Sequence, residues 1–221
     1  MQKILLSWSS GKDSALALHV LRASGELEVA ALLTTLTEPY NRVSMHGVRR
    51  ELLEAQAAAL GLPLEPVWIR PGASNADYET QLHAALAGWR ARGTAAVAFG
   101  DLFLEDVRRY REDSLARAGL AALFPLWGRP THALAREMLR LGLRAVVTCV
   151  DTQALDGSFA GREYDEAFLA DLPAGVDPCG ENGEFHTFVY AGPEFSQVVA
   201  FRLGERVLRE ERFMYADLLP A

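Results

Sequence analysis

Six residues near the amino terminus, Ser9-Ser10-Gly11-Lys12-Asp13-Ser14, constrain the fold of this chain more than any other segment. They follow the apolar run Ile4-Leu5-Leu6 and precede Ala15-Leu16-Ala17-Leu18. This order predicts a buried strand, a tight polar turn and an amphipathic helix. Backbone N–H groups at such a turn converge at the positive end of the helix dipole, which makes an anion site. With Lys12 beside the turn, the ligand that fits is a phosphate group.

The turn departs from the Walker A pattern GxxxxGK[ST] at two positions. The residue five before Gly11 is Leu6, and Asp13 follows Lys12. The segment resembles instead the SGGxDS pyrophosphate loop of the N-type ATP pyrophosphatases, with Ser10 in place of the usual first glycine. The resemblance implies cleavage of ATP between the α- and β-phosphates, with activation of a substrate as its adenylate. The alternative is a serine-rich turn that only caps the helix.

Bulk properties narrow the class of protein. Half of the 221 residues are hydrophobic, which predicts a folded core. No apolar run approaches the roughly 20 residues of a membrane span, and the first residues lack a signal-peptide pattern, so we expect a cytoplasmic protein with no membrane partner. Cys149 and Cys179 give no disulfide framework. A net charge of −7, without a long Lys/Arg cluster, argues against a nucleic-acid partner.

Strands and helices alternate over the first part of the chain. Strands are predicted at Lys3–Ser7, Val29–Thr35, Leu64–Ile69 and Ala95–Phe99. Helices are predicted from near Asp13 to just before Gly25, over Gly47–Leu60 and over Ser74–Arg92. This alternation predicts an α/β fold with a doubly wound, parallel, Rossmann-like sheet. Ligands of such sheets lie beyond the carboxyl ends of the strands, where Ser9–Ser14, Thr34-Thr35 and Gly100-Asp101 fall.

The second part of the chain changes character. Helices are predicted over Thr131–Leu141, with Thr131 as the N-cap, and over Glu163–Leu172. Strands are predicted at Arg144–Val150, Phe185–Tyr190, Gln197–Leu203 and Arg206–Met214, the last two joined by a Gly204-Glu205 hairpin. We therefore expect an ATP-binding domain over residues 1–125 and a smaller α+β domain over residues 126–221, which supplies substrate-binding and catalytic groups.

A second polar constellation lies in that carboxyl-terminal part, between Asp177 and Thr187. Its glycines permit backbone conformations closed to other residues, so Glu181, Glu184 and His186 are able to converge. Converging acids suit magnesium, an ammonium ion or proton transfer. The alternative is an acidic turn that leads into a strand.

The loop at Ser9–Ser14 and the segment Gly180-Glu181-Asn182-Gly183-Glu184-Phe185-His186-Thr187 together resemble the diphthine–ammonia ligase family and its bacterial relatives. Three further stretches are similar to that family: Ser44–Arg49, Gly100-Asp101-Leu102 followed by Arg108-Arg109, and Pro125-Leu126-Trp127. The resemblance extends over essentially the whole chain, and the Ala-, Leu- and Arg-rich composition indicates a bacterial member.

The resemblance implies an ATP-dependent ligase that converts a carboxylate to an amide. ATP would bind with its phosphates on Ser9–Ser14, and with Thr34, Thr35, His46, Gly100 and Asp101 around it. Ammonia would displace AMP from the acyl-adenylate, and pyrophosphate would already have left. The catalytic residues implied are Lys12, Glu181, Glu184 and His186. Asp13 would hold Mg²⁺ or cap the helix, and His46 would contact adenine or substrate or serve packing alone.

Several alternatives stay open at this stage. The carboxylate is either a protein-borne diphthine or a small metabolite, and a homodimer is compatible with the sequence. A nucleotide-binding sensor of the same fold would need no Glu181, Glu184 or His186. A tRNA-thiolating enzyme would use a CxxC pair or a persulfide cysteine, and this chain has no CxxC.

Overall fold

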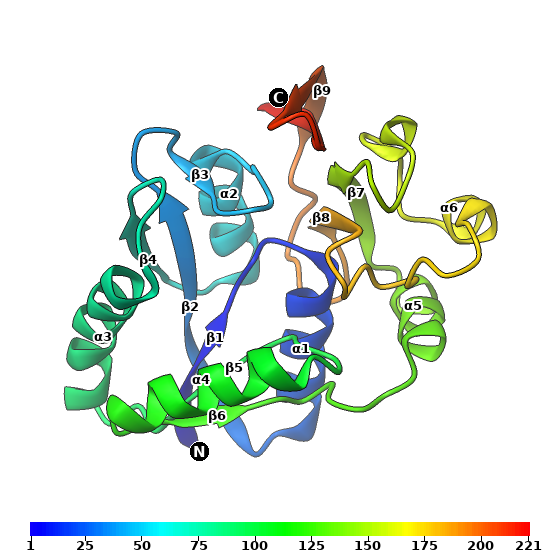
Figure 1. The fold of residues 1–221 in the computed structure, drawn as a ribbon. Helices are drawn as coiled ribbons and strands as arrows, with labels where there is room; N and C mark the ends of the chain where they lie inside the picture. Colours follow the sequence, from blue (N-terminus) through cyan, green and yellow to red (C-terminus); the bar gives the residue numbers. More distant parts are fainter.

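A mostly parallel sheet forms the amino-terminal half of the computed structural model, which describes all 221 residues (Figure 1). Its strands are β1 (Gln2–Ser7), β2 (Leu27–Thr37), β3 (Arg42–Val43), β4 (Leu64–Ile69), β5 (Ala96–Ala98) and β6 (Ala121–Leu123). β4, β2, β1, β5 and β6 lie side by side and run parallel, and β3 pairs antiparallel with the end of β2. The predicted α/β fold is confirmed.

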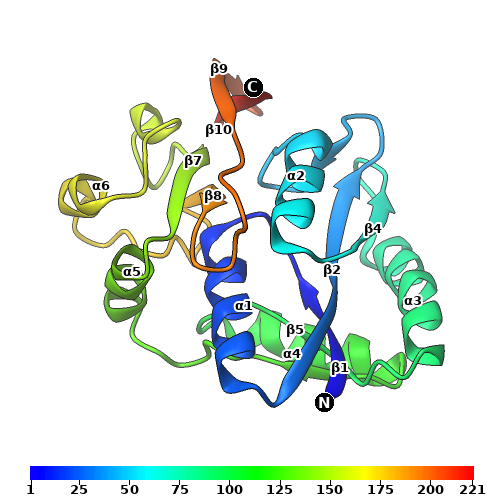
Figure 2. The same ribbon diagram turned by 180° about the vertical axis from the view of Figure 1, so that it is seen from behind.

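Helices cover both faces of this sheet, which we call sheet A. Successive residues of β1 point to opposite faces, so Ile4 and Leu6 join one apolar cluster and Leu5 joins another. The helices α1 (Lys12–Ser24) and α2 (Arg50–Leu60) pack on the first face (Figure 2). The helices α3 (Asn75–Ala91) and α4 (Glu105–Arg117) pack on the second.

The carboxyl-terminal half contains an antiparallel sheet, sheet B, in the order β8-β7-β10-β9. Its strands are β7 (Arg144–Asp151), β8 (Phe185–Ala191), β9 (Phe201–Arg209) and β10 (Phe213–Pro220). The helices α5 (Thr131–Arg140) and α6 (Glu166–Asp171) and the 3₁₀ turn Gly157–Phe159 flank it. The first apolar cluster continues from sheet A through Leu16 to Val147 and Phe188, so the two sheets share one core.

Local signals place several helix ends as predicted. Ser74 caps α3 and Asp77 completes a capping box, and Tyr78, Leu82 and Trp89 of this helix pack in the second cluster. Gly25 and Gly61 end α1 and α2 in the left-handed conformation, at φ 64° and 67°. None of the helices combines the length and apolar character needed to cross a bilayer.

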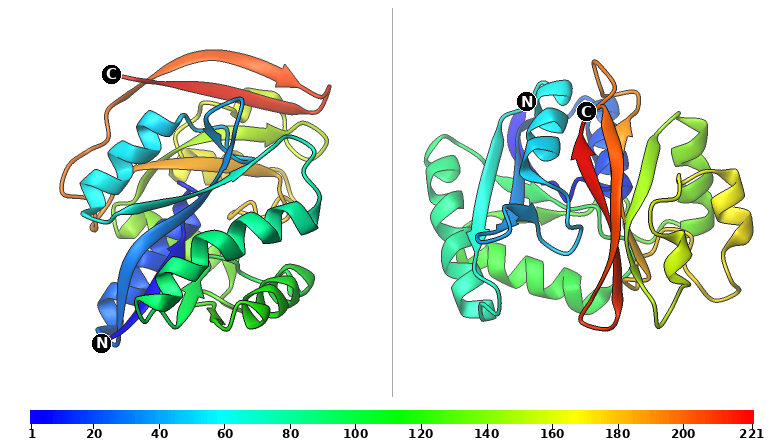
Figure 3. Two further views of the ribbon diagram at one scale, coloured as in Figure 1. Left: turned by 90° about the vertical axis from the view of Figure 1, so that its left-hand side faces the viewer. Right: turned by 90° about the horizontal axis from the view of Figure 1, so that it is seen from above.

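The predicted position of the turn in the carboxyl-terminal hairpin is wrong. Gly204 and Glu205 lie inside β9, and the turn is at Glu210-Glu211, where both residues have positive φ. Gly204 faces an irregularity in β10 between Ala216 and Leu218, where an added Cβ would lie 3.3 Å from the Asp217 carbonyl oxygen. The glycine therefore serves a strand bulge and not a turn. Figure 3 shows the β9–β10 hairpin crossing the end of the molecule opposite the amino terminus.

Three helix starts also differ from the predictions. α2 begins at Arg50 and not at Gly47, because Gly47 has φ 70° and Arg49 is extended. The N-cap of α5 is Pro130 and not Thr131. α6 begins at Glu166 because the Asp165 side chain accepts a hydrogen bond from the Phe168 amide and caps the helix there.

Candidate functional site

A cavity of about 220 Å³ opens at the carboxyl ends of β1 and β5. From β1 the chain builds outward through β2 and β4 on one side and later through β5 and β6 on the other. Ligand sites of open α/β sheets lie at such a reversal of strand order. Nine residues predicted from the sequence line the cavity: Ser9, Lys12, Asp13, Ser14, His46, Gly100, Asp101, Glu181 and His186.

The other predicted residues lie outside the lining. Ser10 and Glu184 are buried beside the cavity, and Gly11 lies in the loop between lining residues. Thr34 is buried, and its hydroxyl donates to the Trp8 carbonyl over 2.7 Å. Thr35 lines a separate small cavity between α3 and α4.

The backbone of the loop requires its small residues. Ser10 has φ 68°, the left-handed conformation that glycine adopts without strain, which explains the glycine of the SGGxDS pattern. A Cβ on Gly11 would lie 2.9 Å from Cε1 of His46. A Cβ on Gly100 would lie 2.9 Å from the Asp13 carbonyl carbon, so β5 closes directly against the loop.

The free edge of β8 holds the loop in place. The Val189 amide donates to the Ser10 carbonyl over 2.9 Å, and the Lys12 amide donates to Oγ1 of Thr187 over 3.1 Å. The buried Gln56 side chain donates to the carbonyls of both Ser10 and Val189. An edge strand presents unpaired backbone groups, and here the loop pairs with them. Sheet B therefore fixes the conformation of a loop that belongs to sheet A.

The amino terminus of α1 presents unpaired hydrogen-bond donors to the cavity. The backbone amides of Asp13 and Ser14 donate to no other residue, and both residues line the cavity. The hydroxyls of Ser9 and Ser14 lie 3.4 Å apart at the same place. Unpaired amides at a helix start, with hydroxyls beside them, suit a phosphate.

Lys12 is sequestered at the base of the cavity. Its side chain is only 2% exposed, and its Nζ donates to the Asp13 carboxylate and to the Cys179 carbonyl. The ammonium also lies 5.4 Å from the centre of the Tyr164 ring and 5.3 Å from that of Phe185. Burial lowers the pKa of Lys12, but the Asp13 carboxylate outweighs it and the net pKa is raised. Lys12 therefore carries its charge within an ion pair.

The two glutamates of the 177–187 segment face different ways. Glu184 Oε1 accepts hydrogen bonds from the Asp177 amide at 3.0 Å and the Asn182 side chain at 2.9 Å, so Glu184 ties the turn together. Glu181 lines the cavity, and its Oε1 accepts from the Leu102 amide at 2.6 Å. Gly180 and Gly183, at φ 68° and 88°, permit this divergence. Burial raises the pKa of Glu181 to about 7, although the Leu102 amide opposes the rise.

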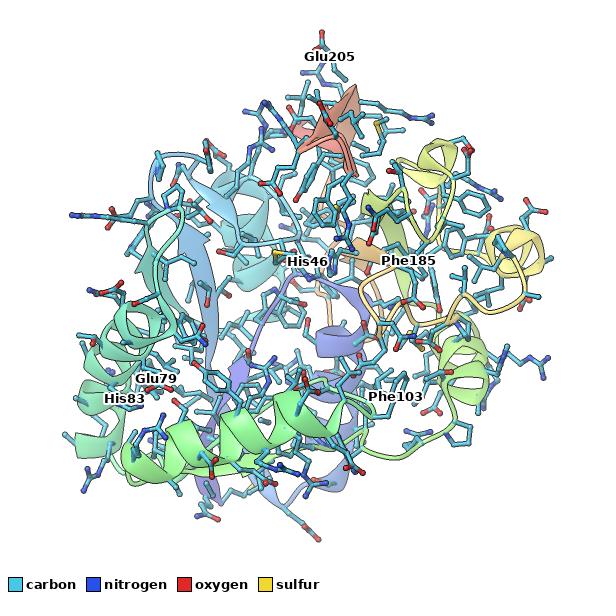
Figure 4. All side chains as sticks on the ribbon, viewed as in Figure 1. His46, Glu79, His83, Phe103, Phe185 and Glu205 are labelled. Atoms are coloured by element: carbon cyan, nitrogen blue, oxygen red, sulfur yellow. The ribbon has the colours of Figure 1, made fainter.

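Two histidines lie against each other in the lining of the cavity. Figure 4 shows His46 and Phe185 between the parts of the molecule that carry sheets A and B. His46 Nδ1 donates to the Thr187 carbonyl over 3.0 Å, which leaves Nε2 as an acceptor. Burial, with the neighbouring His186, lowers the pKa of His46 to about 3, and burial, with Lys12, lowers the pKa of His186 to about 4. Both imidazoles are neutral at physiological pH.

Three contributors have no counterpart among the sequence predictions. Arg111 lines the cavity from α4, Gln56 supports the loop, and Tyr164 donates to the Pro178 carbonyl over 2.8 Å. α4 itself was not predicted, because Ser114 and Leu115 are its only buried residues and its apolar stripe is narrow. The sequence feature that could have indicated Arg111 is the basic run Arg108-Arg109-Tyr110-Arg111, which follows Gly100-Asp101.

Comparisons with known proteins match both halves of the chain. A family model of the diphthamide synthase N-terminal domain matches residues 1–121, and one of its C-terminal domain matches residues 130–216. The chain belongs to the diphthamide synthase family. The two matched ranges carry the two halves of the cavity, the Ser9–Ser14 loop and the 177–187 segment of this diphthamide synthase family member.

Curated relatives carry the name diphthine–ammonia ligase. The chain is 32% identical to the Homo sapiens enzyme over 111 residues, which are 48% of this chain and 42% of that enzyme. It is 33% identical to the Danio rerio enzyme over 114 residues, which are 49% of this chain and 45% of that enzyme. The chain thus spans less than half the length of the curated relatives that it matches.

Proposed function

We propose that this chain is an ATP-dependent amide ligase that joins ammonia to a carboxylate. The observation that carries the proposal is the meeting of the Ser9–Ser14 loop with Glu181 and His186 in one cavity. A phosphate site alone would suit a sensor. Here a titratable carboxylate and two neutral imidazoles face that phosphate site. This combination of groups is typical of an enzyme active site. We assign ATP binding chiefly to residues 1–125 and the proton-handling groups to residues 126–221.

In the first step the substrate carboxylate attacks the α-phosphorus of ATP, and the bond between that phosphorus and the bridging oxygen breaks. The amides of Asp13 and Ser14 and the hydroxyls of Ser9 and Ser14 hold the phosphates. The products of this step are an acyl-adenylate and pyrophosphate.

In the second step ammonia attacks the acyl carbon, AMP leaves with the electron pair of the broken C–O bond, and an amide forms. Attacking nitrogen must lose a proton. Glu181 has a pKa of about 7 and lines the cavity, so its carboxylate accepts that proton. His46 Nε2 accepts a hydrogen bond from the same nitrogen. Glu184 acts indirectly, because it holds the turn that carries Glu181.

Magnesium fits the site through two carboxylates that line the cavity. The structure contains no group of three or more His, Cys, Asp or Glu side chains arranged as a metal site. Magnesium bound with nucleotide phosphates usually takes only one or two carboxylates and keeps several waters. Asp13 and Asp101 line the cavity and would supply these ligands. The ion would neutralise the charge of the departing pyrophosphate.

The protonation state of both cysteines disfavours the tRNA-thiolating enzyme. Burial raises the pKa of the Cys149 thiol to about 11 and raises that of Cys179 further. Sulfur transfer needs a thiolate or persulfide, and both thiols are protonated at neutral pH.

The test is to follow the products of ATP. The protein is incubated with ATP, ammonium and a carboxylate, either diphthine-bearing protein or a fractionated metabolite extract. We expect AMP and pyrophosphate in equal amounts, released only when the carboxylate is present, and nitrogen from ¹⁵N-ammonium in the product amide. Release of ADP and phosphate would overturn the assignment of α-phosphate attack. Saturable ATP binding with no turnover in any fraction would favour the sensor.

A further inference from the structure

The side chains that line the main cavity offer too little free positive charge for a triphosphate. Three carboxylates line it, from Asp13, Asp101 and Glu181, and the cationic side chains are Lys12 and Arg111. His46 and His186 add no charge, because burial lowers the pKa values of both. The ammonium of Lys12 is already bound to Asp13 and to the Cys179 carbonyl. The phosphates of ATP therefore need another cation.

Arg111 is placed to be that cation. It lies on α4, and its guanidinium covers the Phe99 ring, with Cζ 4.3 Å from the ring centre. Its side chain is 27% exposed, whereas that of Lys12 is 2% exposed. It lines the main cavity, close to the phosphate position at the start of α1.

Asp101 holds Arg111 in its present position. Nη2 donates to Asp101 Oδ1 over 3.0 Å. Nε lies 2.8 Å from Asp101 Oδ2, so the guanidinium pairs with both oxygens of that carboxylate. A guanidinium carries five N–H donors in a fork, so the donors that do not face Asp101 remain available to a bidentate acceptor such as a phosphate. Asp101 keeps Arg111 in position until that acceptor arrives.

We propose that Arg111 binds the phosphate chain of the nucleotide and supplies the mobile positive charge of the site. This assignment rests on the proposed function only in taking ATP as the ligand. Lys12 then has a structural part, as the centre of the ion pair and ring contacts that join the loop to the 177–187 segment. Arg111 moves from Asp101 onto the phosphates when the nucleotide binds, and the released Asp101 carboxylate becomes available to a metal ion.

The experiment compares Arg111→Met with Arg108→Met in the full chain, by calorimetric titration with ATP and with adenosine. Arg108 lies on the same helix, stacks on Phe124 and Trp127, and does not line the cavity. We expect Arg111→Met to weaken ATP binding about 10- to 100-fold and to leave adenosine binding unchanged. Arg108→Met should bind both ligands like the native protein. Equal losses for ATP and adenosine, or no loss for either, would overturn the proposal.

A second arm separates charge from packing. Arg111→Ala is titrated with ATP in the presence and absence of millimolar guanidinium or methylguanidinium. We expect the added cation to restore part of the lost affinity, and a matched concentration of tetramethylammonium to restore none. Failure of guanidinium to act, with circular dichroism showing a folded variant, would contradict the assignment. Both arms measure binding, so they stand even if no AMP or pyrophosphate is ever released.

Discussion

The imidazole rings of His46 and His186 lie 4.6 Å apart, centre to centre, and are tilted by 36°. His46 follows β3 in sheet A and His186 lies on β8 in sheet B, so the pair marks where the two halves close on the cavity. Burial lowers both pKa values, and neither ring takes up a proton between pH 5 and 9. The pH dependence of the site must therefore come from another group.

That group is Glu181. Burial raises its pKa to about 7, so turnover should rise with pH through about 7 as the carboxylate ionises. We expect Glu181→Gln to lose about 100-fold or more in turnover and to lose this inflection, while still binding ATP. Glu166→Gln, an exposed glutamate on α6, is the control. An unchanged pH–rate profile in Glu181→Gln would remove Glu181 from the mechanism.

The same shift predicts a stability effect of defined sign. The folded state holds the Glu181 proton more tightly than the unfolded chain, so this contribution to stability is full below the ordinary pKa of about 4.5 and is lost as pH rises through about 7. Glu181→Gln should therefore gain stability relative to the native protein between pH 5 and 8. Thermal unfolding over that range measures the difference, which should be constant below pH 4.5.

Ser10 is strained, and Ser10→Gly should relieve the strain. A non-glycine residue at φ 68° costs about 1 kcal/mol, and the buried Ser10 hydroxyl has no hydrogen-bond partner. We expect Ser10→Gly to raise the free energy of unfolding by about 1 kcal/mol in urea denaturation. Ser10→Ala removes the hydroxyl but keeps the Cβ, so it separates the two effects. A loss of stability in Ser10→Gly would show that the hydroxyl is bonded in solution.

The sequence was sufficient for the parts of this structure that depend on local patterns. Apolar runs and capping residues located β1, β2, β4, α1 and α3 to within two residues at most ends. The loop and the 177–187 segment were identified from their own residues. The Glu210-Glu211 turn was not, because two glutamates at positive φ carry no turn signal.

The contacts that complete the site are long-range and leave no local pattern. The buried Gln56 reads as one polar residue within an apolar helix face, and only the fold shows that its amide bridges Ser10 and Val189. The divergence of Glu181 and Glu184 was likewise not predictable, since it follows from positive φ at Gly180 and Gly183. From the sequence alone, the two carboxylates are expected to converge on one site.

Thr187 should couple the loop to sheet B. Its hydroxyl accepts the Lys12 amide over 3.1 Å, and Thr187→Val removes that acceptor at nearly constant shape. We expect a cost of about 1–2 kcal/mol in the free energy of unfolding and a weaker affinity for ATP. Thr94→Val, at a buried threonine before β5 at the opposite end of the sheet, is the control and should leave ATP affinity unchanged. Equal ATP affinities in the two variants would argue against coupling.

Asp217 should hold the segment that carries His46. Its carboxylate accepts hydrogen bonds from Arg42 at 2.7 Å and from Arg49 at 2.6 Å, and Arg42 also donates to the Gly47 carbonyl. Burial raises the pKa of Asp217, but the bonds from Arg49 and Arg42 outweigh it and hold the pKa at about 2. This stabilisation is present above the ordinary pKa of about 4 and is lost as pH falls toward 2.

We therefore expect Asp217→Asn to lose about 1–3 kcal/mol of unfolding free energy at pH 7, and a difference that shrinks as pH falls below 4. The His46 ring signals in NMR spectra should shift as well. Asp171→Asn, which breaks the exposed pair with Arg162, is the matched control and should change neither. A pH-independent loss of stability would contradict the role of the ion pairs.

The pairing of the loop with β8 has a consequence for the order in which the protein matures. The ribosome makes the loop first, and its partner Thr187 follows 175 residues after Lys12. Until β8 has emerged and folded, Ser10 lacks the hydrogen bond from the Val189 amide that helps to hold its strained conformation. A nascent or truncated chain is thus expected to be unable to use ATP. The ability to use ATP should appear in one step, late in synthesis, when both sheets are present.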